Sequence, residues 1–158
     1  MAGTLNGLSD LNTGPFTGKT RADAELKPGR NEAFDQFGCR KIALYDEAKI
    51  EELMKNEKII RNRLKIKSAI TNAQQFIKIQ EEYGSFDSFL WSYVGGKPVN
   101  NHFQSEDEVP AKAPLSDKIS KDLKKHGFKF VGSTIVYAYM QAVGLVNDHV
   151  KTCYLYKS

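Results

Sequence analysis

The sequence is poor in cysteine and contains no long hydrophobic run. Of its 158 residues only Cys39 and Cys153 are cysteines, too few for a disulfide framework. No apolar stretch approaches the roughly 20 residues that a membrane-spanning helix requires. The N-terminus is polar and rich in glycine, unlike a signal peptide. These absences predict a cytoplasmic protein with no membrane partner, whose thiols are reduced or bound to metal.

Regular structure is lacking at the N-terminal end. Residues 1–30 hold five of the 12 glycines and two of the five prolines, and they show no apolar period. A segment of this composition does not readily supply a packed element. We expect residues 1–30 to be irregular and residues 31–158 to form the folded domain. Neither paired strands nor internal repeats are evident.

Charge is modest in amount but uneven along the chain. Hydrophobic residues make up 41% of the chain and charged residues 27%, which is typical of a globular protein that buries a core. The net charge is +4, with six Lys or Arg against one acid over residues 55–67 and six Lys against two acids over residues 112–130. Such segments favour contact with a polyanion. Solvated helix faces are the alternative interpretation.

The apolar spacing after residue 45 is helical. Asp46 is a suitable N-cap for a helix running to about Lys55. A long helix is expected over residues 59–83, ended by Gly84, and Ser85 caps the next helix. The apolar stripe of the long helix consists of Ile66, Ile70, Ala73 and Ile77.

The second half of the chain predicts three further helices. The helix capped by Ser85 carries aromatic residues that are most simply interpreted as core. After a connection over residues 95–114 that is rich in glycine and proline, Ser116 caps a basic helix ending near residue 126. An apolar helix follows over residues 133–143. The sequence therefore predicts an all-α protein with a single domain.

Residues 115–132, LSDKISKDLKKHGFKFVG, have the layout of a helix-hairpin-helix. A basic helix leads into a turn bracketed by Gly127 and Gly132, and a second helix starts at Ser133, so the motif is expected over residues 116–143. Glycines let the backbone approach a phosphate closely, and the exposed N–H groups at the start of the second helix form an anion site.

Seven residues of this hairpin are candidates for DNA binding. The glycines would admit the phosphate backbone, the hydroxyls would donate hydrogen bonds and the lysines would supply charge, all without reading base sequence. The candidates are Lys124, Lys125, Gly127, Lys129, Gly132, Ser133 and Thr134. The alternative is an ordinary αα-hairpin with a solvated lysine face.

Several stretches of the chain resemble one family of DNA repair enzymes. The run HGFKFVGSTIVYAYMQAVGLVNDH over residues 126–149 is similar to the corresponding run of the DNA-3-methyladenine glycosylase I family. AFDQF over residues 33–37, IIRNRLKI over 59–66 and SFDSFLWSYVGGKP over 85–98 resemble the family in the same order. The resemblance spans residues 31–156, and residues 1–30 do not match.

The resemblance implies an all-α, helix-hairpin-helix DNA glycosylase fold that is N-terminally incomplete here. Such bacterial, cytoplasmic enzymes act as monomers in base-excision repair. They hydrolyse the N-glycosidic bond of 3-methyladenine in double-stranded DNA containing alkylated bases. The damaged base is first turned out of the duplex, which costs a few kcal/mol. Because this base is already a cationic leaving group, the enzyme mainly recognises it and stabilises charge developing on the sugar.

His149 and Cys153 stand four residues apart, a spacing that places both on one face of a helix. Imidazole and thiolate suit zinc, although an exposed histidine near a buried cysteine is the alternative. The resemblance implies a structural zinc held by this pair and by a cysteine and a histidine near the chain start. Neither of those is found before Cys39. Only half of the site is expected, with zinc weak or absent unless Cys39, a second chain or water completes it.

The segment of the family that carries the lesion pocket does not match this chain. The resemblance implies an essential glutamate followed by a Gly-Leu-Ser-Trp motif. Residues 7–9 echo that motif, but Asp10 stands in place of the tryptophan. Glu25 and Glu32 follow the echo, whereas the family glutamate precedes it. We therefore assign no catalytic residue.

A frameshifted or truncated gene, or a variant that lost the lesion pocket, would each explain this N-terminal departure. Three functional hypotheses follow. The chain is an active glycosylase, a catalytically inactive DNA-binding remnant of that enzyme, or a scaffold with no role on DNA. Missing N-terminal helices would also leave apolar faces exposed on the helix from residue 59 and on the last helix. Reduced stability is expected as a result.

Overall fold

The computed structural model describes residues 30–154 and residue 156. Apart from Arg30, the segment predicted to be irregular lies outside them. The Gly-Leu-Ser echo, Asp10 and Glu25 also lie outside the described residues.

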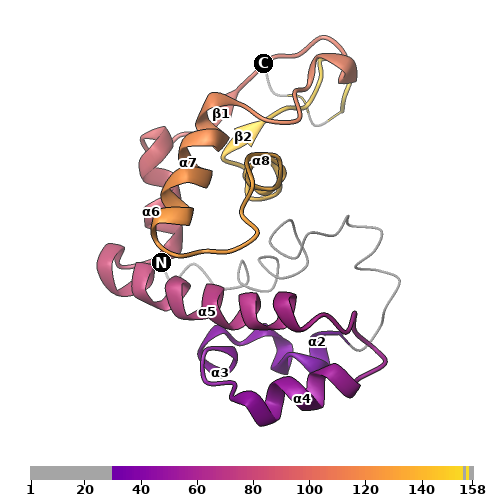
Figure 1. Ribbon diagram of the computed structural model, residues 1–158. Helices are drawn as coiled ribbons and strands as arrows, with labels where there is room; N and C mark the ends of the chain where they lie inside the picture. The colour runs from indigo at the N-terminus through magenta and orange to yellow at the C-terminus, as the bar shows by residue number, and fades with distance from the viewer. Residues whose placement is uncertain (1–29, 155, 157–158) are drawn as a thin grey trace.

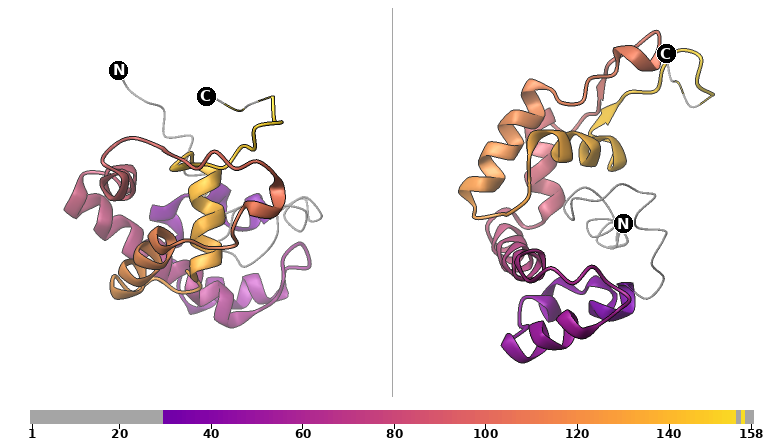
Figure 2. Two further views of the ribbon diagram at one scale, coloured as in Figure 1. Left: turned by 90° about the horizontal axis from the view of Figure 1, so that it is seen from above. Right: turned by 45° about the vertical axis from the view of Figure 1, so that its right-hand side comes forward.

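Two groups of helices lie on opposite sides of the long helix α5 (Arg63–Tyr83), as Figure 1 and the right-hand view of Figure 2 show. The first group consists of α2 (Arg30–Ala33), η4 (Asp35–Phe37), α3 (Cys39–Ile42) and α4 (Glu47–Lys55). The second consists of α6 (Phe86–Trp91), η5 (Ser92–Val94), α7 (Pro114–Lys125) and α8 (Ser133–Ala142). The predicted helical fold is confirmed.

Each group has its own hydrophobic cluster, and α5 contributes to both. The first cluster takes Ile66, Ile70 and Ala73 from α5. The second takes Phe76 and Ile79 from the same helix. The predicted stripe therefore holds for three positions, whereas Ile77 is only partly buried. The buried face changes along α5 because the helix passes from one group of neighbours to the other.

The helix starts follow local side-chain chemistry, with two departures from expectation. Asp46 and Ser85 act as N-caps as predicted, accepting hydrogen bonds from Lys49 N at 2.9 Å and Ser88 N at 2.8 Å. The prediction that α5 begins at residue 59 was wrong. Asn62 caps it by accepting from Lys65 N at 3.1 Å. Ile59 lies in the loop before α5 and is buried. Because it continues the apolar spacing of the helix, the sequence pattern placed the helix start too early.

The start of α7 is the second departure. Ser116 lies inside the first turn and not at the N-cap, because the helix already begins at Pro114. A proline is tolerated there since the first helical N–H groups have no intrahelical partner. The Ser116 hydroxyl accepts from Ala113 N at 2.9 Å and donates to Ala113 O at 2.8 Å. It therefore closes the helix start from within the first turn.

A small parallel strand pair corrects the expectation that no strands are present. β1 (Val99–Asn100) pairs with β2 (Val146–Asn147), with Val99 opposite Val146. Two residues are too few to show the alternation by which a strand is recognised. The connection between α6 and α7 also contains η6 (Glu106–Glu108). The strand pair attaches this connection to the segment that follows α8.

Apolar exposure is found on α5 but not on α8. Ile60, just before α5, is 44% exposed and Leu64 in its first turn is 66% exposed. In α8 Val136, Tyr139 and Met140 are buried and Ile135 is partly buried, so the predicted exposed apolar face of the last helix is not found in the described part of the chain. No helix in the described part of the chain is long and apolar enough to cross a bilayer.

Candidate nucleic-acid interface

The predicted hairpin is formed by α7 and α8, which are joined by a tightly closed turn. Phe128 N donates to Leu123 O at 3.0 Å, and Gly127 N donates to Lys124 O at 3.0 Å. These two bonds are those of a Schellman motif, which requires a left-handed residue directly after the helix. Gly127 fills that position with φ of 91°. The hairpin therefore turns sharply at the predicted glycine.

A buried hydroxyl closes the far side of the turn. Ser120 is 3% exposed and donates to Val131 O at 2.6 Å. Gly132 precedes α8 in an extended conformation, with φ of −64° and ψ of 157°, that any residue adopts. Among the described residues, nothing lies within 4 Å of the position that an added Cβ would take on Gly132. The free space beside Gly132 is what close approach by a phosphate would need.

The two predicted hydroxyl donors differ in availability. Ser133 Oγ lies 2.8 Å from Ser116 Oγ. Because Ser116 already gives its single proton to Ala113 O, Ser133 is the donor in this pair. The Ser133 hydroxyl is thus engaged inside the protein, whereas the Thr134 side chain is exposed.

The three candidate lysines are exposed but not equivalent. Lys125 Nζ lies 3.0 Å from Asp122 Oδ1, and Tyr93 donates a hydrogen bond to the other carboxylate oxygen at 3.0 Å. The Asp122 carboxylate partly offsets the Lys125 charge. Within the described residues, Lys124 and Lys129 make no ion pair. They are therefore the better candidates for contact with a phosphate.

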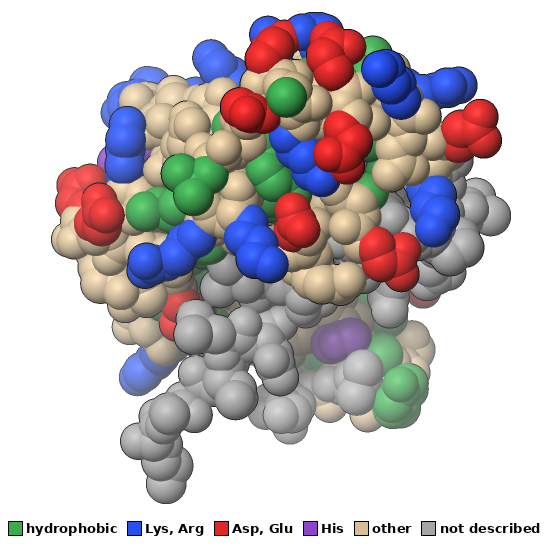
Figure 3. All heavy atoms as spheres, turned by 90° about the horizontal axis from the view of Figure 1, so that it is seen from below, with side chains coloured by type: hydrophobic (Ala, Val, Ile, Leu, Met, Phe, Trp, Pro, Cys, Tyr) green, Lys and Arg blue, Asp and Glu red, His purple; other side chains and the backbone are tan. Residues whose placement is uncertain are grey.

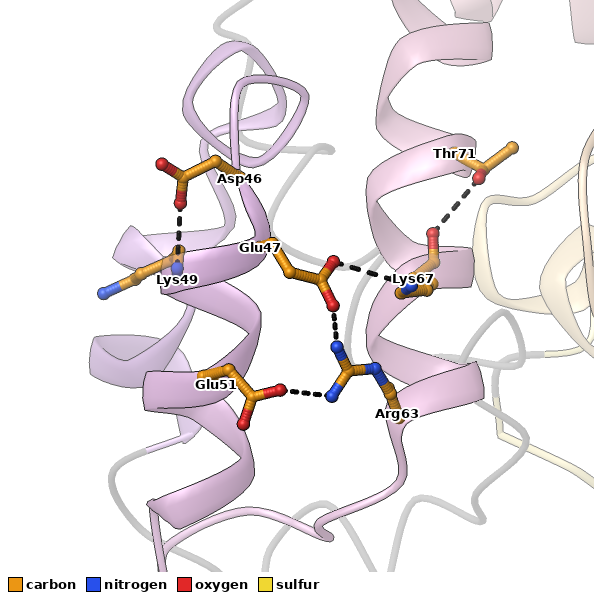
Figure 4. A network of polar contacts seen from close by, with 7 residues as sticks. All are labelled: Asp46, Glu47, Lys49, Glu51, Arg63, Lys67 and Thr71. Carbon is orange, nitrogen blue, oxygen red and sulfur yellow. Dashed lines mark hydrogen bonds and ion pairs between the residues drawn. The ribbon is translucent and has the colours of Figure 1, made fainter.

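The basic segment over residues 55–67 is partly neutralised by α4. Arg63 forms ion pairs with Glu47 and Glu51, and Lys67 Nζ lies 3.5 Å from Glu47 (Figure 4). Figure 3 shows acidic and basic side chains interspersed over the face of the molecule seen from below. Two of the six basic residues in this segment, Arg63 and Lys67, therefore form an interhelical contact, which neither interpretation of the sequence had anticipated.

Two hairpin features were missed by the sequence interpretation. Asn72 on α5 accepts from Lys129 N at 2.8 Å and donates to Lys129 O at 3.0 Å. Phe130, the next residue, has φ of 57° and is 42% exposed. The only available signal was that Thr71 and Asn72 are poor helix formers in the middle of a long helix. That signal does not name a partner 57 residues away.

The two candidate metal ligands are brought together. The prediction that they share one face of a helix was wrong. His149 and Cys153 lie in a turn after β2, with Cys153 Sγ 3.5 Å from His149 Nδ1. This separation is close to the ~3.6 Å edge of a tetrahedral zinc site with one sulfur and one nitrogen ligand. Asp148 anchors the turn by accepting from Asn101, Tyr137 and Gln141 at 2.6 to 2.7 Å.

The other candidate ligands lie elsewhere in the fold. In the described part of the chain, no group of three or more His, Cys, Asp or Glu is arranged to hold a metal. Cys39 begins α3 and packs against both hydrophobic clusters. His102 contacts Tyr156, and His126 packs against aromatic rings. Two ligands of a tetrahedral set are present, and a structural zinc site usually takes four.

The helical fold and the glycine-containing turn between α7 and α8 define a helix-hairpin-helix protein. A model of the methyladenine glycosylase family matches residues 26–156. The match begins five residues before residue 31, where the resemblance was predicted to start. The chain belongs to this family.

Curated relatives carry the same family name. The chain is 43% identical over 123 residues to "DNA-3-methyladenine glycosylase 1" of Escherichia coli, which covers 78% of this chain and 66% of the relative. It is 40% identical over 122 residues to "DNA-3-methyladenine glycosylase" of Haemophilus influenzae, covering 77% and 66%. The chain thus matches just under two thirds of the length of each relative.

Solved structures agree in fold. A crystal structure of 3-methyladenine DNA glycosylase I superposes with a TM-score of 0.86 at 38% identity, covering 96% of this chain and 85% of the other. The Staphylococcus aureus enzyme, solved to explain 3-methyladenine recognition, gives a TM-score of 0.85 at 33% identity, covering 94% and 80%.

Proposed function

We propose that this chain is a base-excision repair glycosylase that hydrolyses the N-glycosidic bond of 3-methyladenine in alkylated double-stranded DNA. Family membership supports this activity. The observation that carries the DNA-binding part is the hairpin itself. It combines a Schellman turn, an open approach beside Gly132 and two lysines, Lys124 and Lys129, that have no carboxylate partner among the described residues.

The hairpin would hold the duplex without reading its sequence. The free N–H groups in the first turn of α8 point toward an incoming anion, and the partial positive charge of the helix start favours a phosphate there. Lys129 adds a charge at the turn, and Thr134 adds a hydroxyl donor. These contacts would fix the position of the duplex while the damaged base is turned out.

A catalytically inactive DNA-binding protein is the second candidate, and one observation favours it. Glu32, the described glutamate nearest to the expected motif, is exposed in the first turn of α2 and belongs to no described cluster of acidic or metal-ligating residues. The two functions share the hairpin and differ only in base release.

The decisive experiment measures release of free 3-methyladenine from methylated duplex DNA and binding to undamaged duplex in parallel. Release above the uncatalysed background supports the glycosylase. Binding without release supports the inactive DNA-binding protein. Lys129→Glu should weaken binding to any duplex sequence and flatten its dependence on salt. Unchanged binding by this variant would contradict the role given to the hairpin.

We also infer that His149 and Cys153 hold zinc only weakly, with water in the remaining positions. The two described ligands do not by themselves fit a structural zinc site. Calorimetric titration with zinc tests this inference, with Cys153→Ser as the variant that should abolish binding. Tight binding at one zinc per chain would contradict it.

We further propose that the protein acts as a monomer in the bacterial cytoplasm. Two free cysteines, Cys39 and Cys153, suit a reducing compartment. Light scattering coupled to size-exclusion chromatography would test the monomer, and a mass of twice the chain would contradict it.

A further inference from the structure

The turn of the hairpin is held to α5 by a side chain that behaves like a peptide group. Asn72 accepts from Lys129 N at 2.8 Å and donates to Lys129 O at 3.0 Å, so it satisfies both backbone groups of one residue. One helical turn along α5, Gln75 lies 3.4 Å from the position a Cβ would take on Gly127. The turn is therefore clamped to the helix that spans both hydrophobic clusters.

The clamped turn buries one aromatic ring and presents another. Phe128 is 5% exposed, and its ring centroid lies 6.1 Å from that of Phe86 in the core. Phe130, two residues later, is 42% exposed and has φ of 57°, in the left-handed region that a bulky L-residue rarely adopts. Strained conformations of this kind persist where surrounding contacts enforce them, and they gather at functional sites.

We propose that Phe130 is an apolar contact to duplex DNA, entering the minor groove beside the phosphate held by the hairpin, and that Asn72 positions it. The proposal rests on the DNA binding proposed above. Lys129, directly before Phe130, faces the same partner with its charge. Apolar side chains that enter the minor groove next to cationic residues are a recurrent way to grip and bend a duplex. Asn72 touches no DNA in this scheme and acts through the conformation of the turn.

The first test compares Phe130→Ala with wild type by fluorescence anisotropy on undamaged duplex DNA over a series of salt concentrations. We expect affinity to fall about tenfold with an unchanged salt slope, because the ring carries no charge. Lys129→Ala should instead lower the slope by about 0.9, the value for one lost phosphate contact. Leu44→Ala is the matched control, since Leu44 is an exposed apolar residue (83%) that follows α3 on the other side of α5.

The second test is a double-mutant cycle between Asn72→Ala and Phe130→Ala. If Asn72 acts by positioning Phe130, its substitution weakens binding in the wild-type background and has little effect when Phe130 is already alanine. Thr71→Ala is the matched control on α5, because the Thr71 hydroxyl donates to Lys67 O of the same helix and makes no other hydrogen bond to the described residues. Circular dichroism establishes that each variant is folded. The comparison of DNA binding between Phe130→Ala and wild type remains valid even if Asn72→Ala destabilises the protein.

Wild-type affinity for Phe130→Ala would overturn the inference while leaving the proposed DNA binding intact. Additive effects in the cycle would overturn the positioning role of Asn72. No duplex binding by the wild-type chain would overturn both the inference and the DNA binding on which it rests.

Discussion

At the scale of single residues, the hairpin depends on hydroxyl groups whose partners are backbone atoms. Ser116 closes the start of α7 and also receives the hydroxyl of Ser133 at the start of α8. Ser120 reaches across the hairpin to Val131 O. Serine in a helix interior is usually neutral or unfavourable, so buried serines at these positions are explained by the turn that they stabilise.

Ser120→Ala should destabilise the protein by about 1–3 kcal/mol, because it leaves the buried carbonyl of Val131 without its partner. Urea unfolding followed by circular dichroism measures the change. Ser105→Ala is the control, since Ser105 is exposed and its side chain makes no cap bond. Equal stabilities for the two variants would show that the Ser120 bond contributes nothing.

The ionisation of the Asp122 carboxyl depends on one of the candidate lysines, Lys125. Hydrogen bonds from Lys125 and then from Tyr93 hold the pKa of the Asp122 carboxyl below its ordinary value of 3.8. Because the folded-state pKa is depressed, this contribution to stability is present above the ordinary value and is lost as the pH falls through the folded-state pKa.

Lys125→Met should therefore raise the pKa of Asp122, and Tyr93→Phe should raise it by less. Carboxyl carbon chemical shifts followed by NMR from about pH 2 to 6 measure both changes. Lys124→Met, which removes a lysine with no described ion pair, is the matched control. A larger shift from Lys124→Met than from Lys125→Met would contradict the assigned cause.

At the scale of elements, the two glycines of the hairpin, Gly127 and Gly132, have different roles. Gly127 sits in the left-handed region with φ of 91°, so a side chain there is strained even though its Cβ would make only an ordinary contact with Gln75. Gly132 is extended, and no atom of the described residues lies within 4 Å of the position of its missing Cβ. Folding requires glycine only at the first position, and a close ligand would require it at the second.

Gly127→Ala should lower stability by about 1–2 kcal/mol, whereas Gly132→Ala should leave stability within about 0.5 kcal/mol of wild type. Gly132→Ala should nevertheless weaken duplex binding, because its methyl group occupies space near the proposed phosphate. Thermal unfolding and anisotropy on the same samples separate the two effects. Unchanged binding by Gly132→Ala would remove the phosphate from that position.

At the scale of the whole molecule, α5 is the structural link between two hydrophobic clusters. Leu53 in the first cluster and Leu123 in the second are both fully buried. A helix of 21 residues that packs against both groups couples them, because separating the groups would expose apolar residues along its length. The two groups should therefore unfold together.

Leu53→Ala and Leu123→Ala should each cost about 2–5 kcal/mol, and each should shift one common transition. Far-ultraviolet circular dichroism reports on both groups, while fluorescence of Trp91 reports on the second. Coincident curves in both variants are expected. A separate early transition confined to Leu53→Ala would show that the two groups are independent.

The sequence alone determined the features that depend on neighbours along the chain. Helix periods, the caps at Asp46 and Ser85, and the glycine turn after α7 were predictable because their interactions span three or four residues. The tertiary structure decided which charges remain free, since Arg63 is paired by α4, and it decided where Asn72 meets Lys129. It also placed His149 and Cys153 in a turn. Such contacts join residues whose separation in space depends on the packing of several helices, which no local pattern encodes.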